Sequence, residues 1–94
     1  MILQIVKLKT RLSEEELMRR AREREPRYKA IPGLLQKYYV KNDSGEFGGI
    51  YVWDSEASLE AFRKSYLATS IPKAYEVKGT PNIEILDILF PFRD

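Results

Sequence analysis

The alternation of hydrophobic and polar residues along the chain predicts strands and helices in the order β-α-β-β-α-β. Segments rich in Ile, Leu, Val and aromatic residues are predicted as strands: 2–9, 34–41, 47–53 and 83–90. Asn42-Asp43-Ser44-Gly45 is predicted as the turn of a hairpin. Residues 1–94 are therefore expected to form one α+β domain with a ferredoxin-like βαββαβ fold, in which both helices cover one face of a four-stranded antiparallel sheet.

The first helix is predicted to begin after Ser13, because Ser13 and Glu16 form a capping box and acidic residues fill the first turn. Pro26 lacks the N–H that an interior helical position needs, so a kink or an end is expected near Glu25. Acidic residues interrupt and flank the arginines of segment 19–24, which favours a solvated helix face over an anion-binding patch.

The second helix is predicted over 55–67, with Leu59, Phe62 and Tyr66 on one face. The segment that follows has no clear periodicity. Within it, residues 71–75 are predicted to form a short helical turn before the last strand.

Two predicted strands are apolar on both faces, and one layer of helices can cover only one face. Ile50-Tyr51-Val52-Trp53 is an unbroken run of large side chains, and segment 83–90 places Ile or Leu on both of its faces. The uncovered face predicts a homodimer, in which a second copy packs on it about a twofold axis. The alternative is that segment 69–81 folds over the open face.

Composition excludes much of the usual enzyme chemistry. The sequence contains no cysteine and no histidine, which excludes disulfides, thiolate metal sites and the commonest general base and haem ligand. No carboxylates have the spacing of a metal site, so neither a metal nor a cofactor is expected. A net charge of +2 is too small to predict nucleic acid or an acidic membrane as a partner. The sequence shows no signal peptide and no apolar run of about 20 residues, so a cytoplasmic location is expected.

The same order of elements occurs in an RNA-binding module, whose third strand stacks bases on aromatic side chains. Aligning Phe47-Gly48 with that motif places Glu46 where glycine belongs and Gly49 where a stacking phenylalanine belongs. The positions that stack bases do not match, so RNA is not an expected partner.

Three segments together resemble the YdhR-type monooxygenase family. They are Ile31-Pro32-Gly33-Leu34-Leu35-Gln36-Lys37, Phe47-Gly48-Gly49-Ile50-Tyr51-Val52-Trp53, and Ser55 through Tyr66. The resemblance covers nearly the whole chain. It implies the dimeric α+β barrel superfamily, which includes antibiotic-biosynthesis and quinol monooxygenases. Members pair two ferredoxin-like subunits sheet against sheet, with a pocket between sheet and helices in each.

The chain departs from the superfamily at two positions that carry ionisable groups. Many members have Glu-x-Trp near the end of the third strand and a His in the following helix. Tyr51-Val52-Trp53 keeps the Trp but has Tyr where Glu would be, and Phe62 stands where the His would be. Without a His to ligate iron, a haem-degrading activity is disfavoured.

The expected pocket residues are aromatic. Tyr51 and Trp53 point the same way along a strand and are predicted as catalytic residues. The Tyr hydroxyl would orient or deprotonate a phenolic substrate, and the indole would stack on its ring. Phe62, Tyr66 and Tyr75 are predicted to bind the substrate. The alternative is that Tyr51, Trp53, Phe62 and Tyr66 are ordinary core residues and that Tyr75 lies on the surface.

Two functional hypotheses follow. The first is a cofactor-independent monooxygenase that acts on a small aromatic or quinol-like compound in an apolar pocket between sheet and helices. The second is a non-catalytic protein on the same fold that binds small molecules or responds to stress. Both expect a homodimer and a small aromatic or apolar ligand.

Overall fold

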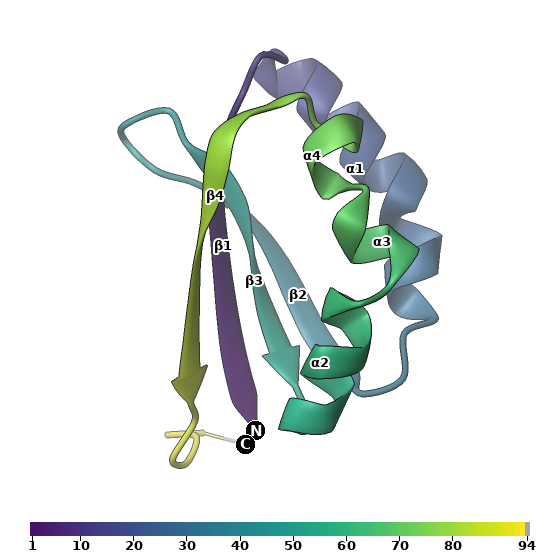
Figure 1. Cartoon of the computed structure of the whole chain (residues 1–94). Helices are drawn as coiled ribbons and strands as arrows, with labels where there is room; N and C mark the ends of the chain where they lie inside the picture. The colour runs from purple at the N-terminus through teal and green to yellow at the C-terminus, as the bar shows by residue number, and fades with distance from the viewer. Residues whose placement is uncertain (94) are drawn as a thin grey trace.

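The computed structural model describes residues 1–93 as one sheet with a layer of helices on one face (Figure 1). The elements are β1 (Ile2–Thr10), α1 (Glu14–Lys29), β2 (Leu34–Lys41), β3 (Phe47–Trp53), α2 (Glu56–Arg63), α3 (Tyr66–Thr69), α4 (Ile71–Ala74) and β4 (Val77–Asp87). The strands lie in the order β2-β3-β1-β4, and every neighbouring pair is antiparallel. The predicted ferredoxin-like α+β fold is therefore confirmed.

The predicted hairpin is present, with Asn42 and Gly45 in its turn. The backbone N–H of Gly45 donates to the carbonyl of Asn42 at 3.3 Å, and Gly45 adopts a positive φ of 83° that a glycine accepts without strain. The hairpin register places Tyr51 opposite Lys37 and Gly49 opposite Tyr39. These inward-facing residues of β2 and β3 are therefore neighbours.

Helix α1 continues past Pro26 to Lys29, so of the two outcomes expected near Glu25, a kink or an end, the end is wrong. The lost hydrogen bond is offset by packing, because the turn after the proline carries Tyr28, which is 3% exposed in the hydrophobic core. The run of arginines is also only partly solvated. Arg24 is buried, and its guanidinium donates to the carbonyl of Leu67 at 2.7 Å.

The Ser13 cap is present as predicted: its Oγ accepts from the backbone N–H of Glu16 at 3.2 Å. We expect Ser13→Ala to lower the free energy of unfolding by about 0.5–2 kcal/mol, because an N–H of the first turn loses its partner. Chemical denaturation measures this change. Ser44→Ala, an exposed position in the hairpin turn, is the matched control and should change little. Equal stability of the two variants would contradict the cap.

The predicted second helix is interrupted. Helix α2 ends at Arg63, and Ser65 then caps α3 by accepting from the backbone N–H of Ala68 at 3.3 Å. The Ser65 hydroxyl also donates to the carbonyl of Phe62 at 2.6 Å. The serine thus ends one helix and begins another, because its side chain competes for backbone groups that a continuous helix would pair. Tyr66 consequently leaves the face that carries Phe62.

The last strand begins earlier and ends earlier than predicted, at Val77 and Asp87 instead of 83 and 90. Pro81 lies within it, which an edge strand tolerates, and the pairing with β1 shifts register between Lys7 and Lys9 beside it. The final bond to β1 is from the N–H of Ile88 to the carbonyl of Met1 at 2.9 Å. The apolar residues beyond it, among them Leu89 and Phe90, are exposed.

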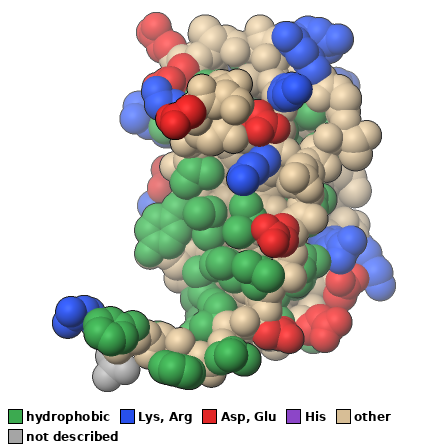
Figure 2. All heavy atoms as spheres, turned by 90° about the vertical axis from the view of Figure 1, so that its left-hand side faces the viewer, with side chains coloured by type: hydrophobic (Ala, Val, Ile, Leu, Met, Phe, Trp, Pro, Cys, Tyr) green, Lys and Arg blue, Asp and Glu red, His purple; other side chains and the backbone are tan. Residues whose placement is uncertain are grey.

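The face of the sheet away from the helices carries a patch of apolar residues, as the two-sided strands predict. Neighbouring outward positions carry Leu3 and Ile5 on β1, Ile50 and Val52 on β3, and Leu86 on β4. None of these residues is fully buried within the single chain. Figure 2 shows hydrophobic side chains gathered over the lower part of this face. Segment 69–81 does not cover this outer face, because α4 lies on the helical side and the residues from Val77 onward belong to β4 (Figure 1).

Candidate functional site

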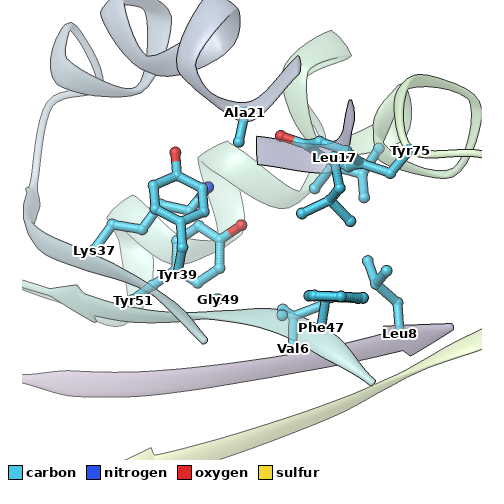
Figure 3. A pocket seen from close by; sticks show the side chains of 12 residues that line it. Val6, Leu8, Leu17, Ala21, Lys37, Tyr39, Phe47, Gly49, Tyr51 and Tyr75 are labelled. Atoms are coloured by element: carbon cyan, nitrogen blue, oxygen red, sulfur yellow. The ribbon is translucent and has the colours of Figure 1, made fainter. Parts of the chain in front are cut away.

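A small cavity of about 40 Å³ lies between the sheet and the helices. Its walls are almost entirely apolar or aromatic. Figure 3 shows Lys37, Tyr39 and Tyr51 rising from the sheet on one side, with Tyr75 on the other. The lining residues are Val6, Leu8, Leu17, Ala21, Lys37, Tyr39, Phe47, Gly48, Gly49, Tyr51, Ile71 and Tyr75.

Tyr51 is the central residue of this space. It points inward from β3 and is 3% exposed. The centroid of its ring lies 6.2 Å from that of the Tyr28 ring. Burial, together with the neighbouring Tyr28 hydroxyl, raises the pKa of Tyr51 well above its usual value. Tyr51 is therefore a neutral hydroxyl that can donate a hydrogen bond, and it is a poor base at neutral pH.

The two glycines of β3 allow the strand and the Tyr51 ring to sit close to their neighbours. A Cβ on Gly48 would lie 1.8 Å from the carbonyl oxygen of Val6, and one on Gly49 would lie 3.1 Å from the Tyr51 ring. The pairing of β3 with β1 is regular through both positions, so no bulge is present here. Position 48 is glycine because the backbone of β1 lies close to it. Position 49 is glycine because the Tyr51 ring needs the space of a side chain.

Lys37 places an amine in this apolar environment. Its Nζ lies 3.4 Å from the ring centroid of Tyr28, 4.4 Å from that of Tyr39 and 4.7 Å from that of Tyr51. Burial and, secondarily, the positive charge of Arg24 lower the pKa of Lys37 to about 7, against a smaller opposing effect of Glu25. The amine can therefore exchange a proton near neutral pH.

Sequence reasoning missed Lys37, although a signal was present. Lys37 and Tyr39 share strand parity, and the hairpin turn fixes Lys37 opposite Tyr51. A lysine on the inward face of a strand is unusual, because its charge must be desolvated or reach the surface.

Tyr75 forms the opposite wall and is held by both backbone and side-chain contacts. The Thr10 hydroxyl donates to its carbonyl, and the Arg24 guanidinium lies 5.5 Å from its ring centroid. Burial raises the pKa of Tyr75 to about 12. Its hydroxyl is buried and has no hydrogen-bond partner among the described residues, and the same holds for Tyr28. Unpaired buried hydroxyls leave hydrogen-bonding capacity beside the cavity.

Two wider clefts adjoin the cavity and share residues with it. Lys37 and Tyr39 also line a cleft of about 290 Å³ that runs along β2 past Tyr28. Tyr51 also lines an apolar cleft of about 200 Å³, together with Gln4 and Phe62. Tyr51 and Lys37 thus stand between the cavity and the two clefts.

The structure separates the predicted site residues into three groups. Tyr51 and Tyr75 line the cavity, and Phe62 meets Tyr51 in the second cleft. Trp53 is 0% exposed, lies in the core and lines none of the three spaces, and its stacking on a substrate stays a prediction. Tyr66 is 77% exposed, because α2 ends before it.

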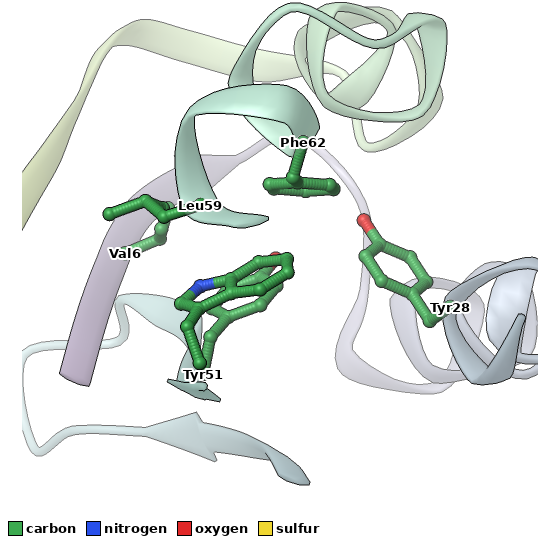
Figure 4. Close-up of a cluster of buried hydrophobic side chains, with 6 residues drawn as sticks. Val6, Tyr28, Tyr51, Leu59 and Phe62 are labelled. Carbon is green, nitrogen blue, oxygen red and sulfur yellow. The ribbon is translucent and has the colours of Figure 1, made fainter. Parts of the chain in front are cut away.

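The core cluster explains the positions of Phe62 and Trp53. Figure 4 shows Phe62 above Tyr51, with Tyr28 beside them. The Trp53 indole stacks on the Tyr51 ring at a centroid distance of 6.1 Å and donates from Nε1 to Oε1 of the buried Gln4 at 3.0 Å. Trp53 therefore supports the residue that faces the cavity, and its polar atom is satisfied inside the core.

Comparison with solved structures defines the class of fold. A "putative antibiotic biosynthesis monooxygenase" from Caulobacter crescentus superposes with a TM-score of 0.78 at 19% identity, over 95% of this chain and 90% of that chain. A Nitrosomonas europaea protein of unknown function gives 0.79 at 22% identity, over 96% and 90%. SnoaB of Streptomyces nogalater, a cofactor-independent oxygenase, gives 0.77 at 8% identity, over 99% and 97%. The fold is that of the antibiotic biosynthesis monooxygenases.

The sequence identifies the family within this class. Residues 2–84 match the family described as "Putative mono-oxygenase ydhR", so the chain belongs to that family. No protein with a curated functional description matches the sequence. Among the described residues, no helix combines the length and hydropathy that a membrane span needs.

Proposed function

We propose that this protein is a cofactor-independent monooxygenase for a small quinol-like aromatic compound. The observation that carries the proposal is the juxtaposition of Tyr51 and Lys37 on the wall of one apolar cavity, with Nζ of Lys37 4.7 Å from the centroid of the Tyr51 ring. Family membership and the shared fold of a cofactor-independent oxygenase support the reaction class. The apolar walls suit a flat ring, and the neutral Tyr51 hydroxyl suits an oxygen substituent.

The proposed reaction requires only quinol and O₂. Loss of one hydroxyl proton gives a quinol anion, which transfers one electron to O₂. The quinol radical and superoxide then combine at a ring carbon and, with the proton, form a hydroperoxide. Its O–O bond breaks with loss of water and leaves a hydroxyquinone. One oxygen atom stays in the product, the other leaves as water, and all four electrons come from the quinol. The protein supplies positioning and exclusion of water.

A ring needs more room than the cavity of about 40 Å³ provides, since an apolar cavity of about 150 Å³ is the size that binds benzene. Lys37 and Tyr39 form the boundary with the cleft of about 290 Å³, and Tyr39 is 37% exposed. A rotation of these two side chains would join both spaces. We infer that the substrate enters along β2 and displaces them.

Tyr51→Phe tests the proposed role of the hydroxyl. We expect oxygen uptake with benzohydroquinone or naphthohydroquinone to fall about tenfold or more, because a hydrogen bond to the developing oxyanion is lost. The thermal midpoint should stay nearly unchanged, since the ring is kept. An oxygen electrode measures uptake, with spontaneous quinol oxidation subtracted.

Tyr66→Phe is the matched control. Tyr66 lies on the exposed α3, so the loss of its hydroxyl should not affect uptake. No uptake by the unaltered protein above the spontaneous rate would contradict the proposed reaction. Ligand binding without uptake would support the second hypothesis, a non-catalytic binding protein.

We further propose that the outer face of the sheet is the interface of a homodimer. The apolar residues on this face are adjacent across three strands, and a second copy would remove them from water. The arrangement would bury one layer of side chains between two sheets. It leaves the helical side, with the cavity and the Lys37 cleft, open to a ligand.

A further inference from the structure

Lys37 is surrounded by aromatic faces and lacks the polar partners of an ordinary lysine. The rings of Tyr28, Tyr39 and Tyr51 approach its Nζ from α1, β2 and β3. Among the described residues, Nζ forms no ion pair within 4.0 Å and no hydrogen bond that the geometry supports. The ring faces attract an ammonium, but they do not replace the hydrogen bonds it makes in water.

The electrostatic surroundings of Lys37 do not hold it permanently charged. The charged and titratable groups that face it are Arg24, Glu25, Tyr28, Tyr39, Tyr51 and Tyr75. Glu25 is the only carboxylate in this set, and it forms its ion pair with Lys29 at 3.6 Å. Burial raises the pKa of Tyr39 and of Tyr51, so neither phenol supplies a negative charge at neutral pH.

Lys37 also lies where an entering ligand would meet it first. It borders both the inner cavity and the outer cleft, so a ring that enters along β2 passes its amine before it reaches Tyr51. A hydroxyl on that ring would find a proton acceptor at Nζ and a proton donor at the Tyr51 hydroxyl. These are the two partners that ionisation of a phenol requires.

We propose, on the basis of the function proposed above, that Lys37 is the catalytic base and that the site selects phenols acidic enough to ionise beside it. The substrate O–H bond breaks, the electron pair stays on oxygen, and the proton forms a new N–H bond at Nζ. The ammonium then lies against three aromatic faces, and the phenolate oxygen accepts from Tyr51. The phenolate thus supplies the ammonium with the negatively charged partner that it lacks in the free protein.

The test uses para-nitrophenol, whose anion is coloured and which is not a quinol. Bound to the unaltered protein, its apparent pKa should fall by about one pH unit or more relative to the free compound, because an ammonium replaces water beside its oxygen. Bound to Lys37→Met, its pKa should rise above the free value, since an apolar cavity disfavours the anion. Absorbance titration of the bound probe measures both shifts.

Lys41→Met is the matched control. Lys41 lies on the same strand with the same parity but is exposed and pairs with Glu14 at 2.8 Å, so its loss should leave the probe titration unchanged. Equal titration of the probe in Lys37→Met and in the unaltered protein would overturn the proposal. So would failure of the probe to bind at millimolar concentration.

A kinetic experiment separates this proposal from the function on which it rests. Oxygen uptake should rise with pH through about 7, the pKa of Lys37, because a base must be neutral to accept a proton. This rise should disappear in Lys37→Ala, and added methylamine should restore part of the lost rate. Unchanged pH dependence in Lys37→Ala would overturn the role of Lys37. If the protein ionises the probe through Lys37 but consumes no oxygen, the role of Lys37 as a base is supported and the proposed oxygenase activity is refuted.

Discussion

Trp53→Ala is expected to lower the free energy of unfolding by about 3–5 kcal/mol. The indole is 0% exposed and packs on Tyr51 and on Phe62, at centroid distances of 6.1 and 5.2 Å. Its removal leaves a cavity in the core and an unpaired amide on Gln4, which is itself buried. Few other single changes would remove as much packing from this chain.

Urea denaturation at one fixed protein concentration measures this effect, because an associating protein unfolds in a concentration-dependent way. Tyr66→Ala is the control: it deletes an aromatic ring that is 77% exposed and should change stability by less than about 0.5 kcal/mol. If the free energy of unfolding of Trp53→Ala falls by less than about 1 kcal/mol, Trp53 is not a tightly packed core residue. That result would favour its predicted role beside the ligand.

Ile50→Asp is expected to convert the proposed dimer to a monomer. Ile50 lies at the middle of β3 on the outer face, opposite Ile5 of β1. In the dimer its carboxylate would be buried without a partner, which opposes association. In the single chain Ile50 is not fully buried, so the fold should tolerate the change.

Sedimentation at micromolar concentration distinguishes the two states. The unaltered protein should sediment at about twice 11.0 kDa and the variant at 11.0 kDa. Ser44→Asp adds the same charge at the exposed hairpin turn and should remain dimeric. A monomeric unaltered protein would remove the explanation for the apolar outer face.

The fold could be predicted largely from periodicity, because one parity of the two central strands, β1 and β3, is buried. The bounds of β2 and β3 agree with the prediction, since the Asn42–Gly45 turn fixes both ends of the hairpin. The errors lie where tertiary contacts outweigh local preference. The burial of Tyr28 extends α1 past Pro26, and pairing with β1 begins β4 at Val77.

The site was less predictable than the fold. Strand parity correctly placed Tyr51 on the helical side, but it could not distinguish a cavity wall from the core at Trp53 two residues later. Tyr66 was misplaced because a single serine cap ended α2. Lys37 was missed although strand parity and the hairpin register place it beside Tyr39 and Tyr51, because parity alone does not show that its amine lies among aromatic rings.

The most direct test of the proposed function follows the oxygen atoms. Protein freed of metal by chelation is given a quinol under isotopically heavy O₂, and the products are analysed by mass spectrometry. We expect one heavy atom in the hydroxyquinone, one in water, and a rate unaffected by the chelator. A plain quinone without a heavy atom, with hydrogen peroxide as the reduced product, would contradict the monooxygenase and indicate simple quinol oxidation.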